Sequence, residues 1–321
     1  MKSPISTEQF IKTWHQTNGI VTEVAKILGF SSTAAASNRR KAIEQERGIT
    51  LPSSSVHSSR NAILRRTHNA RRLEIDLPDG VIVVGSDAHV WPGPLTTAQR
   101  GFLRILQKLK PEVTVLNGDV FDGAKISRHP AGIWDQESRP NVKAELDACQ
   151  SFVAHVEQAS PHSQRIWTWG NHDARIEYTL AAAVPEYEGV AGFALKDHFP
   201  SWQFCMAIFV NSDLVIKHRL ANGIHAVYNN AVKSGRSMVT GHLHSLKVTP
   251  WTDYNGTRYG VDTGTLADPD GKQFDYTEEA PGNHRAGFAV LTIREGKLLQ
   301  PELCQVWDEG RVQFRGELIS V

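Results

Sequence analysis

The sequence predicts an α+β chain in which a small all-helical segment precedes a larger domain of mixed helices and strands. Three observations support this fold class. Apolar residues recur at helical spacing within residues 1–49. From about Leu73, short apolar runs recur, and almost every one ends in a polar cluster. Basic charge gathers in the first 73 residues. A length of 321 residues allows one large domain or two unequal ones.

The composition excludes several classes of protein. With 40% apolar and 21% charged residues, the chain can fill a sizeable core and is not a disordered protein. No run approaches the roughly 18 apolar residues of a membrane span, and the polar start MKSPISTEQF does not resemble a signal peptide. Cys149, Cys205 and Cys304 lie too far apart for a disulfide framework or a cysteine zinc site. We therefore expect a reducing, cytoplasmic setting.

The net charge of +1 conceals an asymmetry. Residues 1–73 carry twelve Lys and Arg against four Asp and Glu, whereas the remainder carries 23 basic and 30 acidic residues. Such a split is typical of a nucleic-acid-facing arm, although a basic tail that only aids solubility would look the same.

The first 49 residues predict three short helices. Ser6 and Gln9 form a capping-box pattern that opens a helix to about Gln16, and a second helix follows the Asn18-Gly19 break. After a turn at Gly29, Ser31 or Ser32 caps a third helix that runs to about Glu46. This third helix is basic and rich in small residues, as in a helix-turn-helix DNA reader. The candidate DNA contacts are Asn38, Arg39, Arg40 and Lys41, and the alternative is a three-helix cap or an oligomerisation element.

Residues 50–73 predict a linker between the helical domain and a domain at 74–321. The stretch from 50 to 60 is rich in Ser and contains a Pro, which is typical of a flexible connection. Five arginines follow: Arg60, Arg65, Arg66, Arg71 and Arg72. They could follow a phosphate backbone, or they could form the solvated face of a helix.

Five apolar runs in the larger domain each end in residues that can bind metal. Continuous apolar runs of this length predict buried strands, and ligands gather beyond the carboxyl ends of such strands. The runs are 81–84, 113–116, 166–169, 214–216 and 238–239, followed respectively by Asp87 and His89, Asp119 and Asp122, Asn171 to Asp173, His218, and His242 and His244. We therefore expect one shared site.

The residue types at these five strand ends predict a metal site. Carboxylates, imidazoles and an amide oxygen, without thiolates, suit Mn, Fe, Zn, Co or Ni better than the oxygen ligands of a calcium site. Seven or more candidate ligands exceed what one tetrahedral ion uses, so we expect two ions with a carboxylate between them.

In their order along the chain, these clusters resemble the five signatures of the calcineurin-like metallophosphoesterases. The signatures are Asp-x-His at 87–89, Gly-Asp-x-x-Asp at 118–122, Gly-Asn-His-Asp at 170–173, a lone His at 218 and Gly-His-x-His at 241–244. The resemblance covers roughly residues 80–270. Each motif alone is weak, but five in order at strand ends are specific.

The resemblance implies a role for each matching residue. Asp87, His89 and His244 would hold the first metal, Asn171, His218 and His242 the second, and Asp119 would bridge the two. His172 would not be a ligand; it would face the scissile phosphate and protonate the leaving oxygen or stabilise its charge. Asp122 and Asp173 would orient imidazoles.

Three further residues are candidate substrate contacts. The family often has Gly after its lone His, whereas this chain has Arg219, which could contact phosphate. Arg128 and His129 follow Asp122 in a basic loop and could touch substrate as well.

The resemblance also implies a four-layer α/β/β/α sandwich with two packed sheets flanked by helices. Helical spacing predicts helices at 96–109 and 141–159. Strands are expected at 259–265 and 288–293, with hairpins near the end of the chain.

The function expected from these observations is a phosphoesterase with two divalent ions, manganese first among them, that cleaves a phosphate ester by attack of a hydroxide bridging the metals. The basic N-terminal helices favour DNA as partner and substrate, and therefore a phosphodiesterase or nuclease. Alternatives are a phosphomonoesterase acting on nucleotides, phosphoproteins or nucleic-acid ends, and a DNA-binding regulator without activity. The domain combination looks like proteins encoded by bacteriophages, which would place this chain in the host cytoplasm. The oligomeric state, the natural substrate and the polarity of cleavage stay open.

Overall fold

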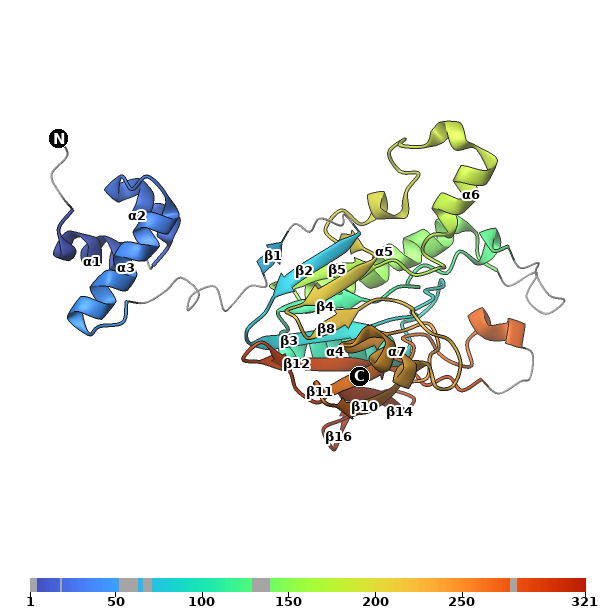
Figure 1. Ribbon diagram of the computed structural model, residues 1–321. Helices are drawn as coiled ribbons and strands as arrows, with labels where there is room; N and C mark the ends of the chain where they lie inside the picture. Colours follow the sequence, from blue (N-terminus) through green and yellow to red (C-terminus); the bar gives the residue numbers. More distant parts are fainter. Residues whose placement is uncertain (1–4, 18, 52–62, 66–70, 129–138, 278–281) are drawn as a thin grey trace. The chain divides into compact units, whose positions relative to one another are not determined.

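The chain divides into two compact units, Met1–Asn61 and Ala62–Val321. The computed structural model describes residues 5–17, 19–51, 63–65, 71–128, 139–277 and 282–321 (Figure 1). Among these residues, no helix is long and apolar enough to cross a membrane.

The N-terminal unit consists of the three expected helices: α1 (Thr7–Gln16), α2 (Val21–Leu28) and α3 (Thr33–Arg47). The Ser6 and Ser32 side chains cap α1 and α3 by accepting backbone N–H groups, while Gly29 ends α2 in the left-handed conformation that favours glycine. Phe10, Trp14, Val24, Ile43 and Leu51 form a small core of their own. Leu51, which follows α3, is part of this core.

The second unit contains two sheets. The first has the strand order β1-β2-β7-β8-β9-β11-β10, and the second has the order β16-β15-β14-β12-β3-β4-β5-β6, with β13 paired to β12. The strands of the first sheet are β1 (Ile63–Arg65), β2 (Arg72–Asp76), β7 (Ala207–Val210), β8 (Leu214–Ile216), β9 (Ser237–Thr240), β10 (Lys247–Asp253) and β11 (Gly256–Asp262). Those of the second are β3 (Gly80–Gly85), β4 (Val113–Leu116), β5 (Gln164–Thr168), β6 (Gln203–Cys205), β12 (Gly287–Arg294), β13 (Lys297–Leu298), β14 (Glu302–Asp308), β15 (Arg311–Phe314) and β16 (Glu317–Ser320).

Helices cover the outer faces of both sheets. The α-helices of this unit are α4 (Thr97–Leu109), α5 (Val142–Ala159), α6 (Arg175–Ala183) and α7 (Ala226–Ser234), and short 3₁₀ turns lie at Ala124–Ile126, Pro185–Tyr187, Leu195–His198 and Lys272–Thr277. α4 packs on α5 and on β3, β12, β14 and β15, whereas α7 packs on β9, β10 and β11 (Figure 1). Helices, two sheets and a helix form the expected four layers.

Strand β3 shows why its sequence is apolar without interruption. Val83 faces the core beneath α4 and α5, while Ile82 and Val84 face the core between the two sheets. Side chains alternate along a strand, so a strand between two apolar layers must be apolar on both faces. The parallel strands β3, β4 and β5 lie side by side, which brings their carboxyl ends to the same edge.

The linker expected at 50–73 overlaps with strands of the second unit. β2 begins at Arg72 and pairs in parallel with β7, and β1 pairs with β2. Of the five arginines in this stretch, Arg60 and Arg66 lie outside the described residues.

Candidate metal centre

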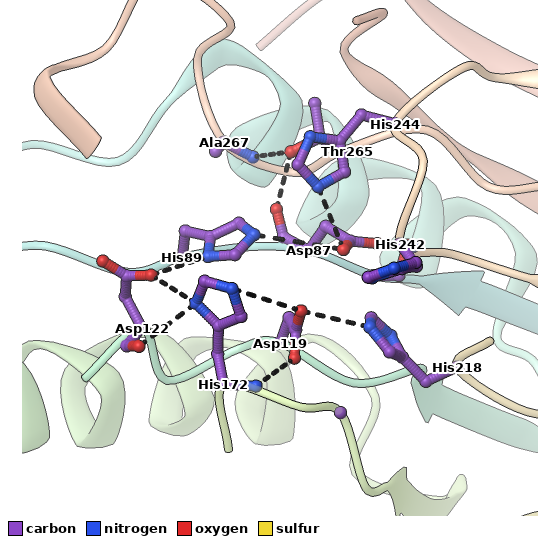
Figure 2. A network of polar contacts seen from close by, with 12 residues as sticks. Asp87, His89, Asp119, Asp122, His172, His218, His242, His244, Thr265 and Ala267 are labelled. Carbon is purple, nitrogen blue, oxygen red and sulfur yellow. Dashed lines mark hydrogen bonds and ion pairs between the residues drawn. The ribbon is translucent and has the colours of Figure 1, made fainter. Parts of the chain in front are cut away.

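Loops from both sheets meet at one edge of the sandwich. The loops after β3, β4 and β5 belong to one sheet, and those after β8 and β9 belong to the other. Their side chains converge on a single cluster (Figure 2). Asp87, His89, Asp119, His242 and His244 all have positive φ angles, between 36° and 74°. Side chains rarely adopt this backbone conformation, and it concentrates at functional sites.

The glycine before each of two motifs allows this convergence. A Cβ on Gly170 would overlap with the Asp119 backbone and carboxylate, and one on Gly241 would overlap with Asp87 and Ser86. Because glycine has no Cβ, the loops at 170 and 241 approach the loops that carry Asp119 and Asp87 more closely than they could with any other residue at these two positions.

The first group of candidate ligands is Asp87, His89 and His244, whose ligand atoms lie within 4.8 Å of one another. Asp87 Oδ1 lies 3.1 Å from His244 Nε2 and 3.9 Å from His89 Nε2. Burial raises the pKa of Asp87, but His244 and His218 outweigh it and lower that pKa to about 2. Asp87 is therefore an ionised carboxylate at neutral pH, the form that binds metal.

The second group is Asp119, His218 and His242, which meets the same 4.8 Å limit. His218 donates from Nδ1 to the Asn117 carbonyl at 2.8 Å, which leaves Nε2 facing Asp119 Oδ2 at 3.1 Å. Burial opposes the charged form of His218, yet Asp119 and Asp87 raise its pKa to about 10. This shift means that the pocket is strongly negative and attracts a cation. Burial and His218 lower the pKa of His242, which favours its neutral, metal-binding form.

The buried donor atoms of these two groups, together with the Asn171 amide oxygen, fit a pair of metal ions. In the part of the chain that the structure describes, four of them have no hydrogen-bond partner: His89 Nε2, Asn171 Oδ1, His218 Nε2 and His244 Nδ1. A buried polar atom without a partner costs about 1–3 kcal/mol, so four in one cluster indicate a missing ligand. The mixture of imidazole, carboxylate and amide is a donor set for transition metals.

Asp122 orients two imidazoles from one oxygen. Its Oδ1 accepts from His89 Nδ1 at 3.0 Å and from His172 Nδ1 at 2.7 Å (Figure 2). Its Oδ2 accepts from Trp91 Nε1 at 2.9 Å. Burial raises the pKa of Asp122, but the bonds from His172 and His89 lower it far below its usual range. The Nδ1 protons of both rings are thus fixed, and each Nε2 points away from Asp122.

Asp173 has a different set of partners from the one we expected. The carboxylate accepts the backbone N–H groups of Asp119, Val120, Phe121 and Gly170 as well as Trp167 Nε1. None of these partners is an imidazole. Asp173 therefore holds the loops after β4 and β5 together.

His172 lies at the edge of the cluster, with 22% of its side chain exposed. Its Nε2 lies 3.9 Å from Asp119 Oδ2 and 3.1 Å from Arg175 Nη2. Burial opposes protonation, but Asp119 and Asp122 raise the pKa of His172. The raised pKa favours the protonated form of this partly exposed ring.

Sequence reasoning missed Arg175 and Asn117. Arg175 donates to the Asp122 carbonyl at 2.7 Å and contacts His172, and Asn117 provides the carbonyl that orients His218. Position alone could have pointed to both, because Arg175 lies two residues after the Gly-Asn-His-Asp motif and Asn117 lies just before Gly-Asp-x-x-Asp. His284, to which the sequence assigned no role, lies with its ring centroid 4.6 Å from that of His244.

The candidate substrate contacts lie near the cluster or outside the described residues. Arg219 is exposed and lines a hollow with Asn171 and His218. Arg128 is also exposed and lines a second hollow with Asn171 and Arg175. His129 lies outside the described residues.

The four candidate DNA contacts lie in α3, in the separate N-terminal unit. Asn38 and Lys41 are exposed. Arg39 instead donates to Thr7 Oγ1, and Arg40 lies over the Trp14 ring and pairs with Glu44. Arg40 is four residues from Ala36 and three from Ile43, so helical spacing turns it toward the unit's own core.

A family model described as calcineurin-like phosphoesterase matches residues 80–270, which include both clusters and His172. The chain belongs to this family. Membership supports a metal-dependent phosphoester hydrolase, and the two clusters of His and Asp fit a dinuclear divalent metal site.

Two solved structures are similar to this calcineurin-like chain. One, titled as the characterisation of a novel archaeal phosphodiesterase, is 16% identical, with a TM-score of 0.34; the match covers 66% of this chain and 92% of the other. The second, titled as a dimetal phosphatase from Danio rerio, is 11% identical, with a TM-score of 0.37; the match covers 76% of this chain and 99% of the other. No curated protein matches the sequence.

Proposed function

We propose that this chain is a phosphodiesterase that hydrolyses DNA with two bound divalent ions. The convergence of two buried groups of metal ligands beside a partly exposed histidine carries the proposal. The mixed oxygen and nitrogen donor set suits manganese, which we place first, ahead of Fe, Zn, Ni and Co.

The candidate ligands divide into two sets, one for each proposed ion. Asp87, His89 and His244 would hold one ion, Asn171, His218 and His242 the other, and Asp119, which faces both groups, would join them. When bound, the ions supply Lewis acidity toward the phosphoryl group and activate water as the nucleophile. Glycine at 170 lets the loop that carries Asn171 approach the Asp119 carboxylate, and glycine at 241 lets the loop that carries His242 approach the Asp87 carboxylate.

His172 is the proposed acid. Its Nδ1–H bonds to Asp122 and fixes the ring, so Nε2 is the atom that can give a proton to the leaving oxygen. The neighbouring carboxylates raise the pKa of His172, which favours the protonated ring that an acid requires at neutral pH. Arg175 Nη2 lies 3.1 Å from Nε2 and restrains the imidazole further.

The exposed face of α3 supports DNA as the partner. Ala34, Asn38, Lys41, Ala42 and Gln45 are exposed at helical spacing. Small residues permit close approach to a groove, amides can pair with adenine edges, and lysine can bind a phosphate. We therefore limit the proposed contacts to Asn38 and Lys41 and assign Arg39 and Arg40 to the packing of the unit.

The cysteines support a cytoplasmic location. Cys149, Cys205 and Cys304 are all unpaired and buried, as in proteins of a reducing compartment. The bacteriophage origin that the combination of domains indicated stays a prediction.

The test is cleavage of end-labelled linear, circular and single-stranded DNA by the manganese-loaded protein. We expect cleavage that EDTA abolishes and that Asp119→Ala reduces to background. Mono- and diester model substrates tested alongside separate the diesterase from a phosphomonoesterase. Hydrolysis of monoesters alone would contradict the proposal.

The partner is tested in the full chain through DNA affinity. We expect a joint Asn38→Ala and Lys41→Ala variant to bind duplex DNA about tenfold more weakly. The variant loses one to two DNA contacts, and each contributes about 1 kcal/mol to the binding free energy. Lys12→Ala, which removes an exposed charge on α1, is the matched control and should bind as the parent does. Equal DNA affinity of the joint variant and the parent would contradict the proposal that α3 binds DNA.

A further inference from the structure

Two hollows lie beside the metal centre and share two residues, Asn171 and Tyr178. One has a volume of about 460 Å³ and is also lined by Arg128 and Arg175. The other has a volume of about 350 Å³ and is also lined by Lys217 and Arg219. Because Asn171 is a candidate metal ligand, both hollows lie next to the proposed reaction site.

Helix α6 separates the hollows and presents Tyr178 between them. Arg175, Thr179 and Ala182 line the first hollow, at spacings of four and three residues, so they share one face of the helix. Ala174 and Glu177 line the second hollow from the adjoining face. Tyr178 borders both, and 59% of this large aromatic residue is exposed, so it is accessible to a stacking partner.

Positive charge lies in both hollows. Arg128 is exposed, and its guanidinium lies 5.7 Å from the centre of the Tyr178 ring. On the other side, Arg219 is exposed and Lys217 is half-buried. The acidic residue there, Glu177, accepts a hydrogen bond from the Leu195 N–H at 2.9 Å. Two cations against one carboxylate leave this hollow with a net positive charge.

We propose that α6 holds a single DNA strand across the metal centre, with one base stacked on Tyr178 and the neighbouring phosphates bound in the two hollows. Arg128 and Arg175 would bind phosphate on one side, and Lys217 and Arg219 on the other. An exposed ring flanked by cations is the combination that single-strand-binding proteins use. A base paired within a duplex cannot stack on a side chain, so the strand must be single or locally open at this point. This inference rests on the proposed phosphodiesterase function and names the form of its substrate.

A short single-stranded oligonucleotide that carries one 2-aminopurine tests the stacking in the full chain. Fluorescence of 2-aminopurine falls when the base stacks on an aromatic ring, and EDTA prevents hydrolysis during the titration. We expect quenching with the parent and with Tyr178→Phe, and none with Tyr178→Ala. Stacking is worth about 1–3 kcal/mol per base, so Kd should rise roughly tenfold in the alanine variant. Tyr254→Ala removes a fully exposed tyrosine outside both hollows and should behave as the parent does.

The phosphate contacts are tested by salt dependence. A joint Arg128→Ala and Arg219→Ala variant should lower the slope of log K against log salt by about 1.4, because each single-strand phosphate contact contributes about 0.7. Arg104→Ala, an exposed position on α4, is the matched control. An unchanged slope in the joint variant would overturn the assignment of the hollows.

The outcomes separate this inference from the proposed function. Quenching that is absent in the parent, or equal in Tyr178→Ala, contradicts the stacking site whatever the enzyme hydrolyses. Hydrolysis of methyl p-nitrophenyl phosphate by the manganese-loaded parent is measured separately. If the parent leaves that small diester intact, the phosphodiesterase proposal fails even where Tyr178 quenches the base.

Discussion

At the scale of single residues, the two histidines bonded to Asp122 have different tasks. His89 Nε2 is buried without a hydrogen-bond partner among the described residues, as a metal ligand would be, whereas the His172 side chain is 22% exposed and contacts Arg175. Both rings use Nδ1 for the same carboxylate oxygen. Exposure, not the hydrogen bond, therefore distinguishes the proposed acid from the proposed ligand.

Replacement of His172 should depend on the leaving group. We expect His172→Ala to lower kcat on a DNA diester by about 10²- to 10⁴-fold, the contribution of a general acid. The loss should be much smaller for bis-p-nitrophenyl phosphate, whose leaving group departs without a proton. Metal content measured on the same samples should be unchanged. Equal losses on both substrates would exclude the acid role.

Glu145 gives a prediction about pH and stability. Its carboxylate accepts the backbone N–H groups of Gly123 and Ala124, next to Asp122, and burial followed by the charge of Asp122 raises its pKa to about 8. Between its unfolded pKa near 4.5 and this value, the native state binds more protons than the unfolded state. The stabilising contribution of Glu145 is therefore lost as the pH rises through this window, by at most about 1.4 kcal/mol per unit.

The measurement is guanidinium denaturation of the metal-free protein between pH 5 and pH 9. Glu145→Gln cannot ionise, so its free energy of unfolding should rise relative to the parent as the pH rises. Asp147→Asn, an exposed substitution on the same helix, serves as the control and should differ from the parent by a constant amount. A constant difference for Glu145→Gln as well would show that Glu145 does not titrate in this range.

At the scale of elements, Asp173 links two strands through their loops. Oδ2 accepts Asp119 N, Gly170 N and Trp167 Nε1, and Oδ1 accepts Val120 N and Phe121 N. We expect Asp173→Asn to lower the free energy of unfolding by about 2–4 kcal/mol, because an NH₂ group then faces at least two buried donors. Chemical denaturation followed by tryptophan fluorescence measures this effect. A loss below 0.5 kcal/mol, the range of an ordinary surface change, would contradict the role.

The elements that carry the site could be predicted from the sequence because their signals are local. Continuous apolar runs identified β3, β4, β5, β8 and β9. Capping residues placed the starts of α1 and α3, and helical spacing placed those of α4 and α5, within a residue or two. β2 was not predicted because it has charged residues at alternate positions and begins within an arginine-rich stretch. Its pairing with β7 depends on contacts more than 130 residues away along the chain, which no local pattern contains.

The sequence predicted which residue types form the site, but it predicted the hydrogen-bond partners of these residues less well. Asp, His and Asn at strand ends are visible in the sequence, whereas the partners of Asp173 are mostly backbone N–H groups, which every residue has. The inward direction of Arg40 was also hidden, because α3 has few apolar residues and only Ala36 and Ile43 mark its buried face.

At the scale of the whole molecule, the chain combines a basic helical unit with a catalytic unit, and the two have separate cores. A shortened chain of residues 62–321 keeps both sheets, including β1 and β2. We expect it to hydrolyse bis-p-nitrophenyl phosphate at the rate of the full chain. Its affinity for duplex DNA should fall and should depend less steeply on salt, since basic residues are lost with the first unit. Equal affinity and salt dependence in the two proteins would show that the helices do not bind DNA.

The central claim is that distant segments of the chain converge to hold two cations. Anomalous diffraction from a crystal of the full chain grown with Mn²⁺ tests it most directly. The account predicts two peaks of anomalous density, one contacted by Asp87, His89 and His244, the other by Asn171, His218 and His242, with Asp119 touching both. A single peak, or none within reach of Asp119, would contradict it.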